Sequence, residues 1–175
     1  WATRGFFGRI NYDYDGRYLL EVNGRYDGSS RFASDHRWGF FPSVSLGWNI
    51  TRESFMEKSL EVLSNLKLRA SWGLLGNQSG AGLYTFTSIM GIQPLGNWYF
   101  QDGRDMYINA PGVIDPFTTW EKVESKNLGL DFGFFNNALT GTFDVFQRDT
   151  KDMLGPSADL ADFFGAEAPN TNNAR

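Results

Sequence analysis

The 175-residue sequence predicts an all-β fold, specifically an antiparallel, up-and-down segment of a transmembrane β-barrel. Three observations predict it. Apolar and polar residues alternate with a period of two in six stretches, aromatic residues make up 17% of the chain, and short links between the stretches alternate with long ones. Cysteine is absent, which excludes disulfides and thiolate metal sites.

The first three predicted strands lie between residues 6 and 50. The turn residues Asp15-Gly16-Arg17 join the first two strands into a hairpin, and a polar stretch at 28–37 separates the second from the third. One phase of each strand is apolar: Phe6, Gly8, Ile10, Tyr12 and Tyr14; Tyr18, Leu20, Val22, Gly24 and Tyr26; Trp38, Phe40, Pro42, Val44, Leu46, Trp48 and Ile50.

The next link is predicted to contain a short helix, because residues 54–57 carry the S-x-x-E pattern of a capping box. The fourth strand, 66–74, ends at Gly76-Asn77, and a long irregular segment follows from 78 to 118. The fifth and sixth strands, 127–134 and 139–145, are joined by a tight turn at Asn136-Asn137. Beyond Leu154 we expect loop, and the six strands are expected to form one continuous sheet.

Three features favour a membrane barrel over a soluble antiparallel sheet, which shows the same alternation. No residue of the apolar phases is charged, and aromatic residues gather towards both ends of the strands with aliphatic residues between them. Short or compact links join the strands at one end and long loops at the other, which is typical of periplasmic turns and extracellular loops. Six strands are too few to close such a barrel, so we expect a fragment of a larger one.

Composition and charge argue against some kinds of membrane anchor and of binding partner. No stretch approaches the roughly 18 consecutive apolar residues of a membrane helix, and the first residues do not form a signal peptide. A net charge of -4 with scattered signs argues against a nucleic-acid partner.

Several motifs in one order resemble the SusC/RagA family of TonB-linked outer-membrane transporters of Gram-negative bacteria. The motifs are Phe7-Gly8-Arg9-Ile10-Asn11-Tyr12, Gly16-Arg17-Tyr18-Leu19-Leu20, 25–32 (RYDGSSRF), 38–43 (WGFFPS), 66–73 (LKLRASWG) with Gly76-Asn77, Trp120-Glu121, 127–132 (NLGLDF) and 150–154 (TKDML). They cover nearly the whole chain.

The resemblance implies that residues 1–175 are part of a TonB-dependent receptor β-barrel domain of about 22 strands, with a plug and a TonB-contact segment outside this sequence. It also implies nutrient import, of oligosaccharides or peptides, together with outer-membrane lipids, TonB and a SusD-like surface lipoprotein as partners. No cofactor is expected. An alternative is a barrel-anchored surface protein that captures glycans or mediates adhesion without transport, and a third hypothesis is a soluble β-sandwich binding module.

Two sets of candidate site residues follow. Aromatic residues of the long external loop are candidates for ligand contact, although such rings often pack a loop upon itself: Tyr84, Phe86, Trp98, Tyr99, Phe100 and Tyr107. Charged residues of the polar phases are expected to face the lumen, where mutual pairing is favoured over a substrate role: Arg9, Asp13, Glu21, Arg25, Lys67, Arg69, Asp131 and Asp144.

Enzymatic and metal sites are not predicted. Asp102, Asp105 and Asp115 do not have the spacing of an EF-hand loop. His36 is the only histidine and lies in a polar turn, so a Ser-His-Asp arrangement would depend on that one residue. Glu121 and Glu124 show no partner carboxylate that would suggest glycoside hydrolysis. We therefore expect neither a catalytic residue nor a bound metal.

Overall fold

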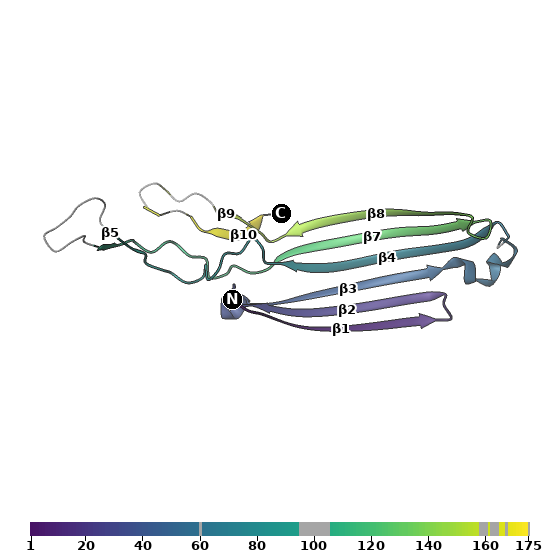
Figure 1. The fold of residues 1–175 in the computed structure, drawn as a ribbon, viewed down its shortest axis with the longest axis horizontal. Coiled ribbons are helices and arrows are strands. Elements are labelled where there is room, and N and C mark those ends of the chain that lie inside the picture. The colour runs from purple at the N-terminus through teal and green to yellow at the C-terminus, as the bar shows by residue number, and fades with distance from the viewer. Residues whose placement is uncertain (60, 95–105, 158–160, 162–164, 167, 175) are drawn as a thin grey trace.

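The computed structural model describes residues 1–59, 61–94, 106–157, 161, 165–166 and 168–174. A six-stranded antiparallel sheet in the order β1-β2-β3-β4-β7-β8 dominates it (Figure 1). Its strands are β1 (Thr3–Tyr14), β2 (Tyr18–Ser29), β3 (Trp38–Asn49), β4 (Leu63–Asn77), β7 (Glu121–Phe134) and β8 (Leu139–Lys151). The prediction of six antiparallel up-and-down strands is confirmed.

Most strands are longer than the alternation predicted. β7 begins at Glu121 rather than 127, and β8 ends at Lys151 rather than 145. The backbone ladder continues there through charged pairs such as Lys122 with Lys151 and Glu124 with Asp149. Apolar alternation detects only the part of a strand that has an apolar face, so it missed these extensions.

The connections separate into two ends of the sheet, visible at opposite sides of Figure 1. The short-turn end carries the turns at 15–17 and 135–138 and the link at 50–62; the long-loop end carries the links at 30–37, 78–120 and 152–174. At the first turn Asp15 and Gly16 have φ of 54° and 61°, and the N–H of Arg17 donates to the carbonyl of Tyr14 at 2.9 Å. The predicted division into short or compact links at one end and loops at the other is confirmed, although the compact link 50–62 has more residues than the loop 30–37.

The predicted short helix lies in the short-turn link in a tighter form. Two 3₁₀ helices fill that link, η2 (Ile50–Arg52) and η3 (Ser54–Ser59). Across the described residues no helix is long and apolar enough to cross a membrane.

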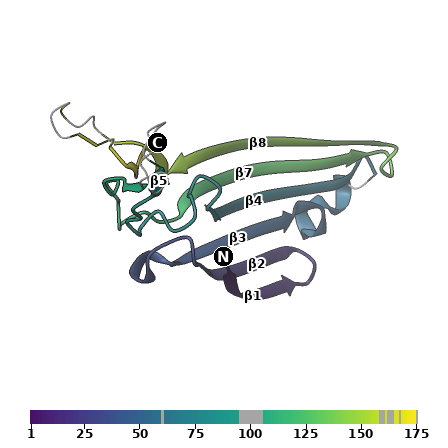
Figure 2. The ribbon, with the colours of Figure 1, turned by 60° about the vertical axis from the view of Figure 1, so that its left-hand side comes forward.

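Parts of the segments predicted to be irregular form small sheets. β5 (Ile92–Pro94) pairs with β6 (Met106–Ile108), and β9 (Met153–Pro156) pairs with β10 (Asn170–Ala174). Strands of three to five residues are too short to show a period of two. The six main strands form one sheet as expected, and these two hairpins extend beyond its long-loop end (Figure 2).

The register places the predicted apolar phases on one face of the sheet. Directly paired residues in an antiparallel sheet point to the same side, so a row of pairs shows which residues share a face. One row crosses all six strands and is apolar throughout: Tyr12, Leu20, Leu46, Ala70, Leu128 and Val145. We call this side the apolar face and the opposite side the polar face.

The apolar band runs obliquely across the strands. Tyr14 is the last apolar residue of β1, and the row of paired residues that contains it reaches Leu130 on β7. The apolar residues of β7 continue beyond this row to Phe134, which lies nearer the short-turn end. The edge of the apolar band at the long-loop end shifts in the same direction. The row of paired residues that contains the apolar Ile10 on β1 reaches a charged residue, Lys126, on β7. A shift of about four to six residues across the four strand spacings from β1 to β7 corresponds to a strand tilt of roughly 35 to 45°, close to that of membrane barrels.

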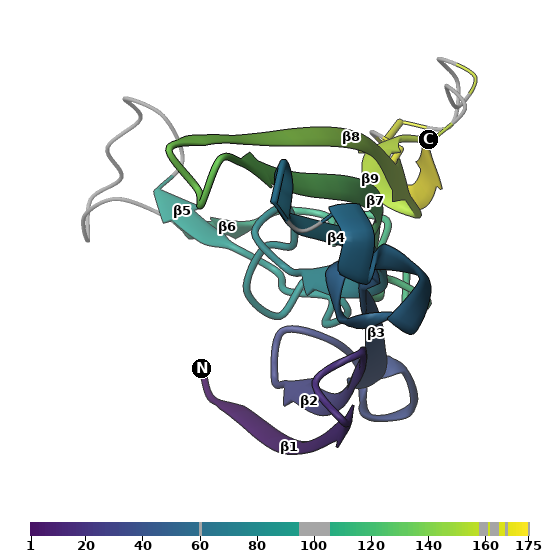
Figure 3. The same ribbon diagram turned by 90° about the vertical axis from the view of Figure 1, so that its right-hand side faces the viewer.

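Aromatic residues gather at both edges of the band. Near the long-loop end Phe6 and Tyr26 stack on Trp38, with ring centroids 6.2 and 4.9 Å apart. Near the short-turn end Tyr18 lies between Tyr14 and Trp48, with ring centroids 6.3 and 6.5 Å apart. Viewed along the strands, the sheet is an arc that runs from β1 to β8 (Figure 3).

Candidate functional site

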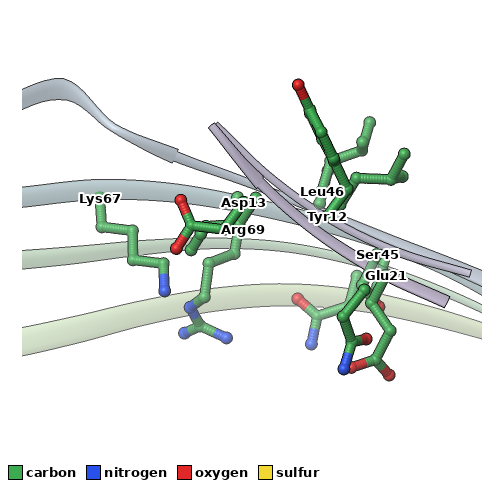
Figure 4. Close-up of a pocket in the computed structure, with 14 residues that line it drawn as sticks. Tyr12, Asp13, Glu21, Ser45, Leu46, Lys67 and Arg69 are labelled. Carbon is green, nitrogen blue, oxygen red and sulfur yellow. The ribbon is translucent and has the colours of Figure 1, made fainter. Parts of the chain in front are cut away.

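The polar face carries all eight charged residues that were predicted to face a lumen. Arg9 and Asp13 lie on β1, Glu21 and Arg25 on β2, Lys67 and Arg69 on β4, and the register places Asp131 and Asp144 on the same side. In the close-up, Asp13, Glu21, Lys67 and Arg69 point to the opposite side from Tyr12 and Leu46 (Figure 4). The arrangement brings these residues onto one surface, and its identity as a lumen wall stays a prediction.

Arg69 is the centre of the polar face on β4, β7 and β8. Its Nε donates to Asp131 Oδ2 at 2.8 Å and its Nη2 donates to Asp131 Oδ1 at 3.0 Å, a bidentate arrangement. The same Nη2 lies 3.3 Å from Asp144 Oδ1. Thr142 donates its hydroxyl to Asp131 Oδ1 at 3.0 Å. One guanidinium therefore balances two carboxylates from neighbouring strands.

Gly129 makes this cluster possible. It lies in register between Arg69 and Asp144, so its side of the strand faces both charged groups. A Cβ atom at this position would lie 2.9 Å from Arg69 Nη2 and would overlap the Asp144 carboxylate. Only a glycine leaves room for the guanidinium to reach across β7.

A second polar network joins β1, β2 and β3. The Nε of Arg9 donates to Asn23 Oδ1 at 2.7 Å, and the Nδ2 of Asn23 donates to Glu21 Oε1 at 2.8 Å and to Ser43 Oγ at 3.3 Å. Arg9 lies 3.9 Å from Glu21. These contacts support the expectation that the charged residues of the polar face pair with one another rather than bind a substrate.

Other predicted polar-face residues have separate roles. Arg25 pairs with Asp27 at 3.0 Å on its own strand. Asp13 accepts the N–H of Gly16 at 2.6 Å, so this carboxylate stabilises the first turn. Lys67 makes no ion pair within the described residues. It contributes to a hollow of about 540 Å³ whose other lining residues include Asn11, Asp13, Glu21, Ser45, Arg69, Ser71 and Asn127 (Figure 4).

The predicted aromatic loop residues are only partly described. Trp98, Tyr99 and Phe100 lie outside the described residues. Tyr84 and Phe86 form an edge-on ring pair with centroids 6.2 Å apart, and the Tyr107 hydroxyl donates to Gln93 Oε1 at 3.2 Å across the β5–β6 hairpin. No ring pair or hydrogen bond within the described residues joins Tyr107 to the other two rings. Their role in ligand contact stays a prediction.

The alternation did not predict a buried aromatic cluster on the polar face at the long-loop end. Phe32 and Trp120 have centroids 5.3 Å apart, and Trp120 meets Phe41 edge-on at 5.5 Å. Ala81 and Leu154 pack against them, so four separate chain segments meet here. The motif 25–32 and the pair Trp120-Glu121 could have indicated it, because they place aromatic residues at the ends of strands.

Glu121 ties this cluster together. It is 8% exposed and accepts the side-chain N–H of Asn77 at 2.6 Å and the backbone N–H of Leu154 at 3.0 Å. Asn172 on β10 accepts the N–H of Thr119 at 2.8 Å and donates to its carbonyl at 3.1 Å. His36 meets Phe117 edge-on at 5.6 Å. These bonds fix the long loops over one end of the polar face.

Comparison with known proteins is consistent with this geometry. The sequence profile of the family described as "TonB dependent receptor-like, beta-barrel" matches residues 2–175. The chain is 42% identical to the TonB-dependent receptor SusC of Bacteroides thetaiotaomicron over 164 residues, which cover 88% of this chain and 16% of the relative. It is 35% identical to the TonB-dependent receptor P26 of Formosa agariphila over 156 residues, which cover 85% and 14% respectively.

Solved structures show the same fold. The RagAB peptide transporter superposes with a TM-score of 0.77 at 32% identity, and the "open-open" state of the RagAB peptide importer does so with a TM-score of 0.79 at 32% identity. Each superposition covers 97% of this chain and 18% of the other. The chain thus spans about a sixth of the length of the curated relatives that it matches.

Proposed function

The chain belongs to the TonB-dependent receptor β-barrel family of the bacterial outer membrane, and we propose that it forms part of the barrel wall of a nutrient importer. The observation that carries this proposal is the oblique, charge-free apolar band with aromatic residues at both edges, opposite a polar face of paired charges. A barrel wall that contacts lipid on one side and a hydrated lumen on the other needs one apolar face and one polar face. Members of the family are transporters and not enzymes.

In this arrangement the apolar face contacts lipid and the polar face lines the lumen. The short-turn end faces the periplasm and the long-loop end faces the exterior, because outer-membrane barrels have short periplasmic turns and longer external loops. Residues 1–175 are then one part of the barrel domain, and the plug and TonB-contact segment belong to other parts of the parent protein.

The polar face serves mainly as a structural wall. Arg69, Asp131 and Asp144 satisfy one another, and so do Arg9 and Glu21 through Asn23. Solute contact is assigned instead to the aromatic residues of the long loop, among which Tyr84 and Tyr107 are exposed. Rings exposed at an external rim can stack on the apolar faces of sugars or on peptide side chains.

The substrate class is oligosaccharides or peptides, and a SusD-like lipoprotein covers the long-loop end. The likeness to SusC and to the RagAB peptide importer supports both parts of this proposal. TonB supplies the energy through the parent protein's contact segment.

Uptake measurements test the proposal. In cells that make the full-length protein, deletion of its TonB-contact segment is expected to abolish growth on the oligosaccharide or peptide that the intact protein imports, while the barrel still assembles. Purification from the outer membrane is expected to yield a much longer polypeptide with a lipoprotein bound. Unchanged growth after the deletion, combined with retained binding of glycans to the cell surface, would favour the adhesion alternative.

A further inference from the structure

We propose that the outer edge of β6 binds an extended peptide as an added antiparallel strand. This inference rests on the proposed import function and narrows its substrate class from oligosaccharides or peptides to peptides. The β5–β6 hairpin belongs to the long link that is assigned to solute contact, and among the described residues it forms a sheet of its own. Both strands are exposed along their whole length.

The hydrogen-bonding pattern of the hairpin leaves the backbone groups of Met106 and Ile108 on its outer edge. Asn109 donates its N–H to the carbonyl of Gly91 at 2.8 Å, which makes these two residues a hydrogen-bonded pair. Hydrogen-bonded and non-hydrogen-bonded pairs alternate along an antiparallel ladder. The next pair, Ile92 with Ile108, is therefore non-hydrogen-bonded, and so is the pair that contains Met106. The N–H and C=O groups of such residues point away from the partner strand.

The two edges of the hairpin differ in what they offer. On the β6 edge, Met106 and Ile108 each present an N–H donor and a carbonyl acceptor. The corresponding residues of β5 are Ile92 and Pro94, and proline has no N–H to donate. In the part of the chain that the structure describes, no backbone hydrogen bond to another strand occupies the β6 edge. The β6 edge therefore has the complete pattern that an added strand requires.

One side of the hairpin is apolar and suits the side chains of such a strand. Directly paired residues share a side of a sheet, and the apolar side holds Ile92, Pro94, Met106 and Ile108. The side chains of Ile92, Met106 and Ile108 are 64%, 60% and 63% exposed. A peptide residue that pairs directly with Met106 or Ile108 would place its own side chain on this apolar side.

The hairpin lies over the side of the sheet that is assigned to the lumen. Its link packs on the polar face, where Ala81 belongs to the buried cluster of Phe41 and Trp120. Viewed along the strands, β5 and β6 lie on the inner side of the arc (Figure 3). The hairpin also extends beyond the long-loop end of the sheet (Figure 2). Its apolar side is therefore separate from the band that contacts lipid and lies at the external mouth of the proposed solute path.

A peptide fits this combination better than an oligosaccharide or a lipoprotein does. The peptide backbone satisfies the β6 edge while alternate side chains cover the apolar side, whereas an oligosaccharide has no regular series of amide donors and carbonyl acceptors. Residues 80–94 and 106–114 contain no charged side chain, so the contact suits an uncharged stretch of peptide. An edge of three residues offers few hydrogen bonds, which suits a solute that must be released better than a permanently bound lipoprotein.

Binding of model peptides to the full-length transporter in detergent tests the inference. The reference probe is a capped peptide in which threonine and valine alternate, so that its valines pair with Met106 and Ile108. N-methylation of the valine nitrogens removes the donors that face β6 and is expected to weaken binding about tenfold or more. N-methylation of the threonine nitrogens is the matched control, because these point away from β6 and affinity should be retained. Equal affinities of the two methylated peptides, or no binding of the reference peptide, overturn the proposal.

Matched proline variants locate the edge. Ile108→Pro removes a donor from the β6 edge and is expected to weaken binding of the reference peptide about fivefold. Ile92→Pro makes the same side-chain change on the same side of the hairpin, but its N–H belongs to the opposite edge, so affinity should be retained. Equal affinities of the two variants overturn the proposal. Loss of the copurifying lipoprotein from Ile108→Pro, with peptide affinity unchanged, assigns the edge to the lipoprotein and also overturns it.

Uptake separates this inference from the import proposal. The expected discrimination between the methylated peptides without any TonB-dependent uptake contradicts import and leaves the peptide site intact. TonB-dependent uptake together with equal affinities contradicts only the site. Heat-dependent gel mobility verifies that each variant barrel is folded, and the comparison of methylated peptides uses the wild-type protein, so it does not depend on the folding of a variant.

Discussion

The guanidinium of Arg69 on β4 forms two hydrogen bonds with the carboxylate of Asp131 on β7, at 2.8 and 3.0 Å. The two residues are far apart in the sequence and meet because Lys67 pairs directly with Asp131 in the ladder, which places Arg69 two positions further along. The carboxylate of Asp144 on β8 accepts a hydrogen bond from the same guanidinium. A single side chain thus links three adjacent strands on the polar face.

Removal of Arg69 is expected to weaken the barrel more than removal of either acid. Arg69→Met leaves two carboxylates of neighbouring strands close together without a cation, whereas Asp144→Asn leaves the bidentate pair with Asp131 intact. The expected loss is modest because these side chains are partly exposed. Thermal unfolding of the full-length protein in detergent measures it, and a larger loss in Asp144→Asn than in Arg69→Met would contradict the central role of Arg69.

Gly129→Val is expected to destabilise assembly. A Cβ at this position would overlap the Arg69 and Asp144 side chains and force the cluster apart. Gly8→Val is the matched control, because Gly8 is also a strand glycine and a Cβ there meets nothing within 4 Å. The amount of folded barrel in the outer membrane is the measurement, and equal amounts for the two variants would show that the close approach at Gly129 is unimportant.

Neighbouring residues on β3 are expected to respond oppositely to a charge. Leu46→Lys places a cation in the middle of the apolar band and is expected to cost about 2 to 4 kcal/mol of folding free energy. Ser45→Lys introduces the same charge on the polar face, in register with Glu21, and is expected to be tolerated. Denaturant unfolding in lipid vesicles compares the two, and similar losses would contradict the assignment of lipid and lumen faces.

The stability of the short-turn end is expected to fall at low pH. The hydrogen bond from the Tyr18 hydroxyl, followed by that from the Trp48 indole, lowers the pKa of Glu53 below its usual value of 4.5. A carboxyl group with a lowered pKa stabilises the folded state above its ordinary pKa, and this contribution disappears as the pH falls through the lowered value.

Thermal unfolding as a function of pH tests this expectation. Between pH 6 and 3 the wild-type melting temperature should fall further than that of Glu53→Gln, because the variant lacks the titrating group. Glu57→Gln is the control, since it removes an exposed carboxylate from the same link and should retain the wild-type pH dependence. Identical dependences of the melting temperature on pH in the wild type and Glu53→Gln would show that Glu53 does not contribute to the loss of stability at low pH.

Phe32→Ala is expected to release the long loops. Phe32 is 1% exposed and packs on Trp120, so truncation leaves a cavity and costs about 3 to 5 kcal/mol locally. Limited proteolysis of intact membranes should then cleave the segment at 78–82 faster. Leu83→Ala is the control, because Leu83 is 52% exposed at the same end of the sheet. Equal cleavage rates in both variants would exclude a role for the cluster in fixing the loops.

The sequence by itself determined the strands and their faces. Alternation is a local property that depends only on which side chains contact lipid or water, so it identified the six strands, and the turn residues at Gly16 and Asn136 identified two of the links. It also placed the candidate polar residues in the correct phase, since a period of two fixes the face once a strand is known.

Only the tertiary structure decided which residues meet. The Arg69 cluster and the contact of Trp120 with Phe32 join residues distant in the chain, and their geometry follows from strand register. The charged ends of β7 and β8 escaped prediction because backbone pairing, which no side-chain pattern reveals, holds them in the sheet. An apolar hollow at Ala70 likewise depends on residues from four strands, β1 to β4, so its existence follows from how those strands align.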